Sequence, residues 1–391
     1  MTVILFDPET SWKNLLPLTF TRPISEIRIG ALTIKQKWDK WLKTTCGCLT
    51  QQYLQKKYPL LKVAENLFIN STICPTDKLV ELISNLKSNQ ALTNNGEIVA
   101  FVGTVNDLDD LSGFENIDIA IPLFTIKNVW DVFQKNAEAI QLDLDILCVN
   151  RKSQPLSDSV TVIGNKNLVF LEEGAKAEAC ILNTTTGPIY LDKGSEIMEG
   201  SVVRGPFVLG EQSTLKLCTK IYGATTIGPH CKVGGEVNNS VIFGYSNKAH
   251  DGFLGNSVIG EWCNLGADTN NSNLKNNYSN VKLFNYLQKK SVNTGLQFCG
   301  LIMGDYSKTG INTMFNTGTL VGVGANIFGG GFPPTLIPSF SWGGAQGFED
   351  YHLDKLFETS EKVFERRGLI FSADEKEILT EVKKIVNGKI I

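Results

Sequence analysis

Aliphatic residues recur at every sixth position through the middle of this chain. The strictest run keeps that spacing over Leu191, Ile197, Val203, Leu209, Leu215, Ile221, Ile227 and Val233. The spacing returns at Phe253, Ile259 and Leu265, and again at Met303, Thr309, Phe315, Val321 and Ile327, after a weaker run at Ile163, Val169, Ala175 and Ile181. No α-helix or ordinary hairpin sheet needs a period of six, whereas a parallel β-helix does.

A hexapeptide period has a simple physical meaning. Each hexapeptide forms one short strand and one corner, and three of them close a triangular coil whose inward side chains stack on those of the next coil. Glycine follows many periodic residues, as at Gly210 and Gly228, where it relieves backbone strain at a corner. We therefore predict a left-handed parallel β-helix over residues 156–330, with Phe315 and Phe328 in its core, as an exception to the usual right-handed crossover. The run is too regular for chance periodicity in an antiparallel protein.

The pattern before residue 156 is different, because strand-like and helix-like segments alternate there. Short apolar runs predict strands at Val3–Phe6, Leu67–Ile69 and Glu97–Val102. Apolar residues at helical intervals predict helices over Ala31–Leu42, Asp77–Asn85 and Val129–Leu142. Such alternation is typical of an open sheet with helices on its faces. Residues 1–155 are thus predicted to form an α/β domain.

Two insertions interrupt the six-residue period, at Asn183–Pro188 and Asn270–Asn293. In a solenoid such insertions protrude from a corner, often on the binding face, and the longer one is either a substrate lid or a solvated loop. Residues 331–391 are predicted to form an exit loop and charged amphipathic C-terminal helices. These helices are expected to cap the solenoid or to pack on a neighbouring copy.

Composition narrows the class of protein. The 391 residues carry a net charge of −3, which gives no footprint for nucleic acid or an anionic membrane. The nine cysteines lack metal-ligand spacing, so reduced thiols and no metal site are expected. The N-terminus does not resemble a signal peptide, and the chain has no apolar run of about 18 residues that would span a membrane. The predicted location is cytoplasmic.

One segment of the repeats carries candidate chemistry: His250-Asp-Gly-Phe-Leu-Gly-Asn-Ser-Val-Ile-Gly-Glu-Trp-Cys-Asn-Leu-Gly-Ala-Asp-Thr269. It aligns without gaps to the pattern H-x-x-Y-x-G-x-x-x-I-G-x-x-x-N-I-G-A-G-T. Together with the α/β domain and the β-helix, this segment resembles the sugar nucleotidyltransferases fused to hexapeptide-repeat acyltransferases. Within that group it is similar to the bifunctional N-acetylglucosamine-1-phosphate uridyltransferase/glucosamine-1-phosphate acetyltransferase family.

The resemblance implies roles for four residues. His250 falls on the general base, which takes a proton from the sugar amine as it attacks the acetyl thioester; imidazole suits this because its pKa lies near neutrality. Asn264, Asn273 and Ala267 fall on positions that contact the substrate or the acetyl donor. The resemblance further implies acetyl-CoA or another acyl-CoA as donor, a sugar phosphate or nucleotide sugar as partner, a homotrimer, and a part in cell-envelope sugar metabolism.

The chain departs from this family where the family binds phosphate. A tyrosine near the base is Phe253 here, and a pair of lysines upstream is replaced by Asn238 and Asn239. We infer that the acceptor differs from glucosamine 1-phosphate. Glu236 is a candidate to orient His250, as a carboxylate would.

The N-terminal resemblance rests on Pro17-Leu-Thr-Phe-Thr-Arg-Pro23, which reproduces the P-L-T-x-x-x-P of nucleotidyltransferases. The Gly-rich loop before it is missing, and Trp12 stands where backbone N–H groups would have to approach a triphosphate. Lys13, Arg22 and Arg28 are candidates for phosphate binding, with ordinary ion pairing as the alternative. Mg²⁺ would be needed if nucleotidyl transfer is active.

Three functions stay open at this point, because a fold alone does not determine function. The first is a transferase that acts on sugar phosphates or nucleotide sugars, with acyl transfer in the β-helix and nucleotidyltransferase-type activity or binding in the N-terminal domain. The second is a catalytically degenerate scaffold that binds nucleotide sugars, and the third is a nucleotidyltransferase whose β-helix is purely structural. His230 and His352 are predicted to be structural in all three.

Overall fold

The computed structural model describes residues 2–60 and 63–388. The first residue of the predicted N-terminal domain and the last three of the predicted tail therefore lie outside the described residues. Contacts between residues divide the chain into two compact units. The first unit comprises Met1–Ile27, Leu32–Asn128 and Ala373–Glu381, and the second comprises Arg28–Ala31, Val129–Ser372 and Val382–Ile391.

The first unit is built on a six-stranded sheet. Its strand order is β4 (Gly47–Leu49), β1 (Thr2–Phe6), β5 (Asn66–Asn70), β7 (Glu97–Gly103), β6 (Gln90–Asn94) and β8 (Glu115–Asp118). Strands β4, β1 and β5 are parallel, whereas β7 runs antiparallel to both of its neighbours. The predicted α/β domain is confirmed as an α/β sheet, and β4, β6 and β8 are strands that the apolar pattern did not reveal.

The helices of the first unit include the two segments predicted at Ala31–Leu42 and Asp77–Asn85, and the helix Glu9–Asn14, which was not predicted. They are α1 (Glu9–Asn14), α2 (Ile34–Leu42) and α3 (Asp77–Ser84), with short 3₁₀ helices at Ile24–Glu26 and Val105–Asp109. Helix α2 begins later than the predicted Ala31, because the Thr33 side chain accepts from the Gln36 N–H and Gln36 reaches back to the Thr33 N–H. This capping box satisfies N–H groups that the helix leaves without internal partners. The short strands β2 (Arg28–Ile29) and β3 (Leu32–Thr33) precede the helix.

The single helix predicted over Val129–Leu142 is wrong, since the structure has α4 (Asp131–Gln134) and α5 (Asn136–Leu147) instead. The break coincides with Asn136, whose side chain is fully buried. Its Oδ1 accepts from the Gly30 N–H at 2.8 Å, and its Nδ2 donates to the Ala224 carbonyl at 2.9 Å. These bonds hold the start of α5 against a solenoid corner within the second unit.

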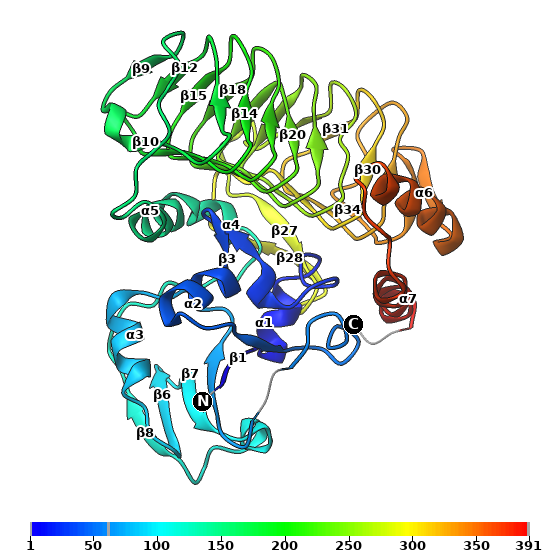
Figure 1. The fold of residues 1–391 in the computed structure, drawn as a ribbon. Coiled ribbons are helices and arrows are strands. Elements are labelled where there is room, and N and C mark those ends of the chain that lie inside the picture. Colours follow the sequence, from blue (N-terminus) through cyan, green and yellow to red (C-terminus); the bar gives the residue numbers. More distant parts are fainter. Residues whose placement is uncertain (1, 61–62, 389–391) are drawn as a thin grey trace. The chain divides into compact units, whose positions relative to one another are not determined.

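The second unit contains the predicted parallel β-helix, which is confirmed (Figure 1). Its first face runs β10 (Val169–Leu171), β13 (Ile189–Leu191), β16 (Phe207–Leu209), β19 (Thr225–Ile227), β22 (Val241–Ile242), β25 (Val258–Ile259), β29 (Leu301–Met303), β32 (Thr319–Val321) and β34 (Leu336–Ile337). Its second face runs β11 (Lys176–Ala177), β14 (Glu196–Ile197), β17 (Thr214–Leu215), β20 (Lys232–Val233) and β23 (Asn247–Lys248), then β30 (Lys308–Thr309), β33 (Asn326–Ile327), β35 (Ser341–Gly344) and the antiparallel β36 (Gly347–Asp350). Its third face runs β9 (Thr161–Ile163), β12 (Ile181–Asn183), β15 (Val202–Arg204), β18 (Lys220–Tyr222), β21 (Glu236–Asn238) and β24 (Phe253–Gly255), with β26 (Asn270–Asn271) and β31 (Met314–Phe315) paired further on.

Inward side chains form continuous apolar columns through the coils. In the first face Leu191 pairs with Leu209 and Leu209 with Ile227, and all three are fully buried. Every residue of the strictest periodic run is buried in this way. Burial of apolar surface is the main stabilising contribution to such a column.

The weaker periodic runs are wrong by one residue at several positions. Ile163 and Ile181 are exposed, and Phe253 is only partly buried. Their neighbours Leu182 and Leu254 are the buried members, and Leu254 pairs with the buried Val237. The separate prediction that Phe328 belongs to the core is also wrong, since Phe328 is exposed while the periodic residue Ile327 beside it is buried. Because successive strand residues point to opposite faces, a shift of one residue exchanges the inward and outward side chains.

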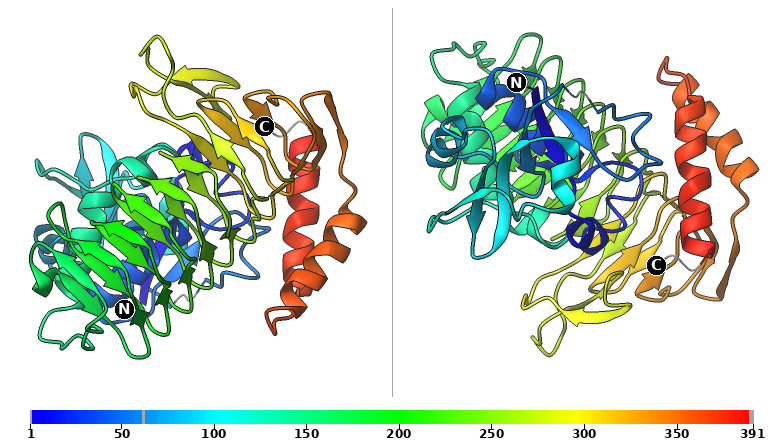
Figure 2. Two further views of the ribbon diagram at one scale, coloured as in Figure 1. Left: turned by 90° about the horizontal axis from the view of Figure 1, so that it is seen from above. Right: turned by 90° about the horizontal axis from the view of Figure 1, so that it is seen from below.

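The insertion Asn270–Asn293 is an ordered arm. It ends in an antiparallel hairpin of β27 (Lys282–Asn285) and β28 (Lys290–Asn293), which Figure 2 shows in yellow beside the coils. Val281 and Leu283 are fully buried, so the arm packs by its apolar side rather than behaving as a solvated loop. After the coils come α6 (Leu353–Glu365) and α7 (Ala373–Asn387).

A stack of rings lines the corner between the first and second faces. His230 stacks on Tyr245 with ring centroids 4.8 Å apart, Tyr245 on Trp262 at 4.3 Å, and Trp262 on Phe364 of α6 at 3.7 Å. His230, Tyr245 and Trp262 all adopt positive φ angles, which side chains other than glycine rarely take. Ring stacking offsets that strain and holds α6 against the solenoid within the second unit.

Candidate functional site

The corner between β23 and β24, residues Ala249–Gly252, is called the His250 corner below. It borders a cavity of about 410 Å³ lined by Lys216, Leu217, Gly234, Gly235, Ala249, His250, Asp251, Ala267 and Asp268. His250 is exposed, so its imidazole is open to a ligand. Lys216, Asp251 and Asp268 supply charge of both signs around it.

A buried lysine supports this corner from inside the solenoid. Lys248 occupies an inward position, since it pairs with the fully buried Val233, and it is 2% exposed. Its Nζ donates to the carbonyl of His250 at 2.8 Å and to the carbonyl of Gly234 at 3.1 Å. Burial is the larger effect on Lys248 and lowers its pKa to about 8, although the nearby carboxylates of Asp251 and Asp268 raise it. The lysine therefore ties two successive coils together directly behind His250, and the sequence analysis missed it.

The structure brings only one of the other resemblance-derived residues to the same cavity, namely Ala267. Asn264 is exposed on the second face, bridged in register between Asn247 and Lys308. Asn273 lies at the base of the arm, where its Nδ2 donates to Oδ1 of Asn256 at 2.8 Å. Neither asparagine lines the cavity next to His250.

The carboxylate of Glu236 has partners other than His250. Tyr222 donates its hydroxyl to Glu236 Oε1 at 2.6 Å, and Lys220 Nζ lies 3.6 Å from Oε2. Phe253 is the register partner of Glu236 on the neighbouring strand. Glu236 thus belongs to a surface cluster on the third face.

The three phosphate-binding candidates differ in their surroundings. Lys13 forms a 2.7 Å ion pair with Glu9 one helical turn away, which is the ordinary ion pairing considered above. Arg28 donates to the carbonyl of Ala31 at 2.5 Å. Arg22 is buried and 4% exposed.

Trp12 stands where the resemblance predicts a glycine-rich loop, and its side chain is buried. Its indole Nε1 donates to the carbonyl of Thr19 at 2.9 Å, and the Thr19 hydroxyl donates back to the Trp12 carbonyl at 2.8 Å. Both residues are buried. These reciprocal bonds hold Trp12 and Thr19 together at the position where the resemblance predicts a glycine-rich phosphate loop.

Asp7 is a further polar centre that the sequence analysis missed. It follows β1, at the edge where the parallel strands β4, β1 and β5 end. Its carboxylate accepts from the hydroxyls of Thr50 and Ser71, each at 2.6 Å, and from the Ile24 N–H at 3.1 Å. Burial raises the pKa of Asp7 to about 6, although these hydrogen bonds lower it. Ligands of open α/β sheets bind at this edge, and strand ends are where such a residue can be sought in a sequence.

The described residues contain no group of three or more His, Cys, Asp or Glu side chains arranged to hold a metal ion. Both oxygens of Asp7 already accept hydrogen bonds, so this carboxylate does not fit a Mg²⁺ ligand. Among the described residues, none of the helices has the length and apolar character needed to cross a membrane.

Comparison with known proteins finds a matching family model for the N-terminal part of the chain. Residues 3–152 match the family model described as sugar nucleotidyl transferase. No curated protein matches the chain.

Solved structures with similarity to the chain include a UDP-N-acetylglucosamine acyltransferase from Arabidopsis, at 17% identity over 59% of this chain and 90% of that one, with a TM-score of 0.25. A hexapeptide transferase family protein from Anaplasma phagocytophilum is 14% identical over 57% of this chain and 89% of that one, with a TM-score of 0.16. Another UDP-N-acetylglucosamine acyltransferase is 13% identical over 60% of this chain and 89% of that one, with a TM-score of 0.24. The N-terminal part of this chain is thus similar to the family described as sugar nucleotidyl transferase, and it is followed by a parallel β-helix.

Proposed function

We propose that the chain is a transferase that moves an acyl group from an acyl-CoA donor to the amine of a sugar phosphate or nucleotide sugar at the His250 corner. The observation that carries the proposal is an exposed imidazole at the rim of a cavity of about 410 Å³, on main chain held by a buried lysine. A rigid support of this kind limits the movement of a general base.

The acceptor amine attacks the thioester carbonyl, and His250 takes the proton that the amine loses. The C–S bond then breaks, and the thiolate leaves with the electron pair and is protonated. Asp251 and Asp268 line the same cavity as His250. Asn264 and Asn273 do not line this cavity, so a role for them in this step depends on a neighbouring copy in the predicted trimer.

The N-terminal unit is proposed to bind the nucleotide sugar rather than to make it. Support comes from the Trp12–Thr19 bonds where the resemblance predicts a glycine-rich loop and from the saturated carboxylate of Asp7. A regulatory scaffold is the second candidate, and the same observations favour it. A thermal-shift panel separates the two, because stabilisation by acyl-CoA favours the enzyme and stabilisation by nucleotides alone favours the scaffold. The trimer and the cytoplasmic location stay predictions.

The deciding experiment incubates the purified protein with acetyl-CoA and a panel of amino-sugar phosphates and nucleotide sugars, with products detected by mass spectrometry. We expect His250→Ala to lower the rate by about 10²- to 10⁴-fold. His352→Ala is the matched control, because His352 is exposed and lies outside the cavity. Acylation that survives in His250→Ala, or no acylated product with any acceptor, would contradict the proposal.

A further inference from the structure

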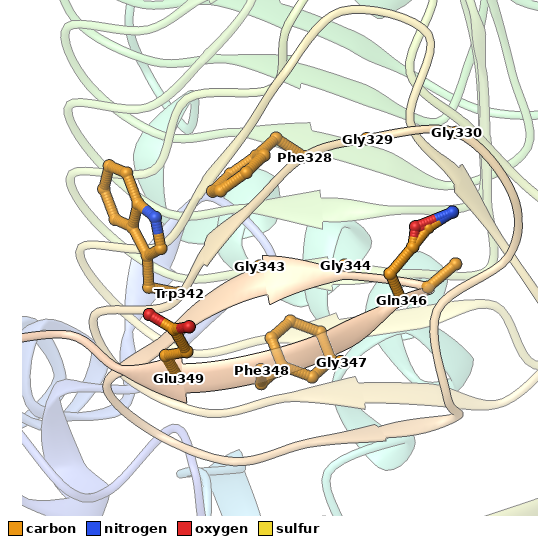
Figure 3. A pocket seen from close by; sticks show the side chains of 11 residues that line it. Phe328, Gly329, Gly330, Trp342, Gly343, Gly344, Gln346, Gly347, Phe348 and Glu349 are labelled. Carbon is orange, nitrogen blue, oxygen red and sulfur yellow. The ribbon is translucent and has the colours of Figure 1, made fainter.

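The C-terminal end of the solenoid contains a second cavity, of about 550 Å³, whose lining shares no residue with the His250 corner. It lies between the loop that follows β33 and the β35–β36 hairpin, all within the second unit. Figure 3 shows Phe328 and Trp342 near one end of it and Gln346 near the other. None of the functions considered above uses this cavity.

Two aromatic side chains line the cavity without being buried by the protein. Phe328 is 40% exposed and Trp342 is 39% exposed. Their ring centroids lie 5.1 Å apart at an interplanar angle of 68°. Large exposed apolar side chains that adjoin a cavity commonly mark a binding site.

Glycine at position 330 has no explanation within the protein. Its φ angle is not in the left-handed region, and a Cβ built on it would meet no atom within 4 Å. Gly344 in the same cavity is different, because its Cβ would lie 2.0 Å from the Phe328 carbonyl oxygen. In the described part of the chain, the N–H groups of Gly329, Gly330 and Gly331 form no backbone hydrogen bond. The loop therefore offers open space and main-chain donors to a ligand.

The charge of the lining restricts the ligand class. Neither lysine, arginine nor histidine lines the cavity, whereas Glu349 does. Among the described residues, the Glu349 carboxylate has no hydrogen-bond or ion-pair partner. Such a lining disfavours phosphates and nucleotides, and the main-chain donors are unsuited to a simple cation. A fitting ligand has an apolar face, groups that donate to a carboxylate and groups that accept from N–H.

We infer that this cavity binds a neutral saccharide. A pyranose ring presents C–H groups on its face, which pack on Trp342 and Phe328, and hydroxyls at its edge. Those hydroxyls donate to Glu349 and accept from the N–H groups of the glycine loop. The inference does not depend on acyl transfer at His250.

Saturation-transfer difference NMR and calorimetry on the full chain test this inference, with the methyl glycosides of glucose, galactose and N-acetylglucosamine as probes. At least one glycoside is expected to bind, with the strongest saturation on ring C–H protons. Trp342→Ala and Gly330→Ala should each weaken that binding at least tenfold. Phe332→Ala, an exposed aromatic residue outside the cavity lining, and His250→Ala should leave it unchanged.

The thermal midpoint of Gly330→Ala should equal that of the parent protein, because the added methyl group meets no protein atom. Absence of binding by all three glycosides would overturn the inference. So would tighter binding of glucose 1-phosphate or choline than of any neutral glycoside. A changed oligomeric state of Trp342→Ala or Gly330→Ala in light scattering would instead show that the cavity is an interface between copies of the chain.

Discussion

The strand ends of the N-terminal sheet and the His250 corner of the solenoid both rely on one buried charged group. Asp7 accepts from two hydroxyls and one N–H, whereas Lys248 donates to two carbonyls. The bonds of Asp7 occupy both oxygens of its carboxylate. Those of Lys248 engage only main chain and leave the imidazole of His250 at the cavity. A buried charged group can therefore either close a region to ligands, as Asp7 does, or hold the main chain behind an open site, as Lys248 does in the solenoid.

The largest expected effect comes from Asp7→Ala. The change leaves the Thr50 and Ser71 hydroxyls and the Ile24 N–H without their acceptor, and each unsatisfied buried group costs about 1–3 kcal/mol. We expect a loss of about 4 kcal/mol in the free energy of unfolding of the first unit, measured by hydrogen exchange in β1 and β5. Asp7→Asn, which keeps an acceptor oxygen, should lose less. Equal protection in the parent and Asp7→Ala would mean that the Asp7 network is not a structural support.

The next effect tests which residue of the third face points inward. Leu254→Ala removes a fully buried side chain and should lower the free energy of unfolding by about 3 kcal/mol. Phe253→Ala should cost about 1 kcal/mol, because Phe253 is only partly buried. Urea unfolding followed by circular dichroism measures both. A larger loss for Phe253→Ala would restore the register that the six-residue period predicts.

The sequence predicts the solenoid far better than it predicts the positions of its individual side chains. A period of six reports one physical constraint, the stacking of equivalent residues, and that constraint recurs in every coil. The period cannot report a coil that is shortened at its corners. In the shortened coils Lys248 takes one inward position, and another moves from Phe253 to Leu254. Lysine at such a position was overlooked because a charged residue is normally assigned to the surface.

The residues of the candidate site could also be predicted only in part from the sequence. His250 could be proposed from the spacing of its neighbours, but its support could not, since the carbonyls that Lys248 binds belong to two different coils. Asp7, Thr50 and Ser71 are far apart in the chain and meet only because their strands are parallel neighbours. The stacked rings of Tyr245 and Trp262 occupy backbone positions that favour glycine, so no propensity indicates them.

The third effect concerns pH and the Lys248 network. The pKa of Lys248 is lowered to about 8 in the folded protein, from an ordinary value of 10.5. The unfolded chain therefore binds more protons between these values, and stability rises with pH there. Relative to Lys248→Met, which carries no titrating group, the parent should gain about 2 kcal/mol of unfolding free energy between about pH 7.5 and 9.5.

Urea unfolding of both proteins at the two pH values measures this difference, and titration of other groups cancels in the comparison. Lys248→Gln is the control that keeps a polar group without the charge. A constant difference between parent and Lys248→Met across this range would show that Lys248 is not buried as a titrating group.

The smallest expected effect tests whether Glu236 acts on His250 or only lies on a neighbouring face of the solenoid. Glu236 is held by Tyr222 and Lys220 on the third face, so Glu236→Gln should leave the rate of acyl transfer within about twofold of the parent, or about 0.4 kcal/mol of activation free energy. Tyr222→Phe removes the same hydrogen bond from the other side and should behave alike. The measurement is kcat/KM as a function of pH. A decrease of more than tenfold with a shifted acidic limb, found for Glu236→Gln and not for Tyr222→Phe, would mean that Glu236 sets the protonation of His250. In that case the solenoid site would depend on a carboxylate on its outer face, and Lys248 would no longer be its main support.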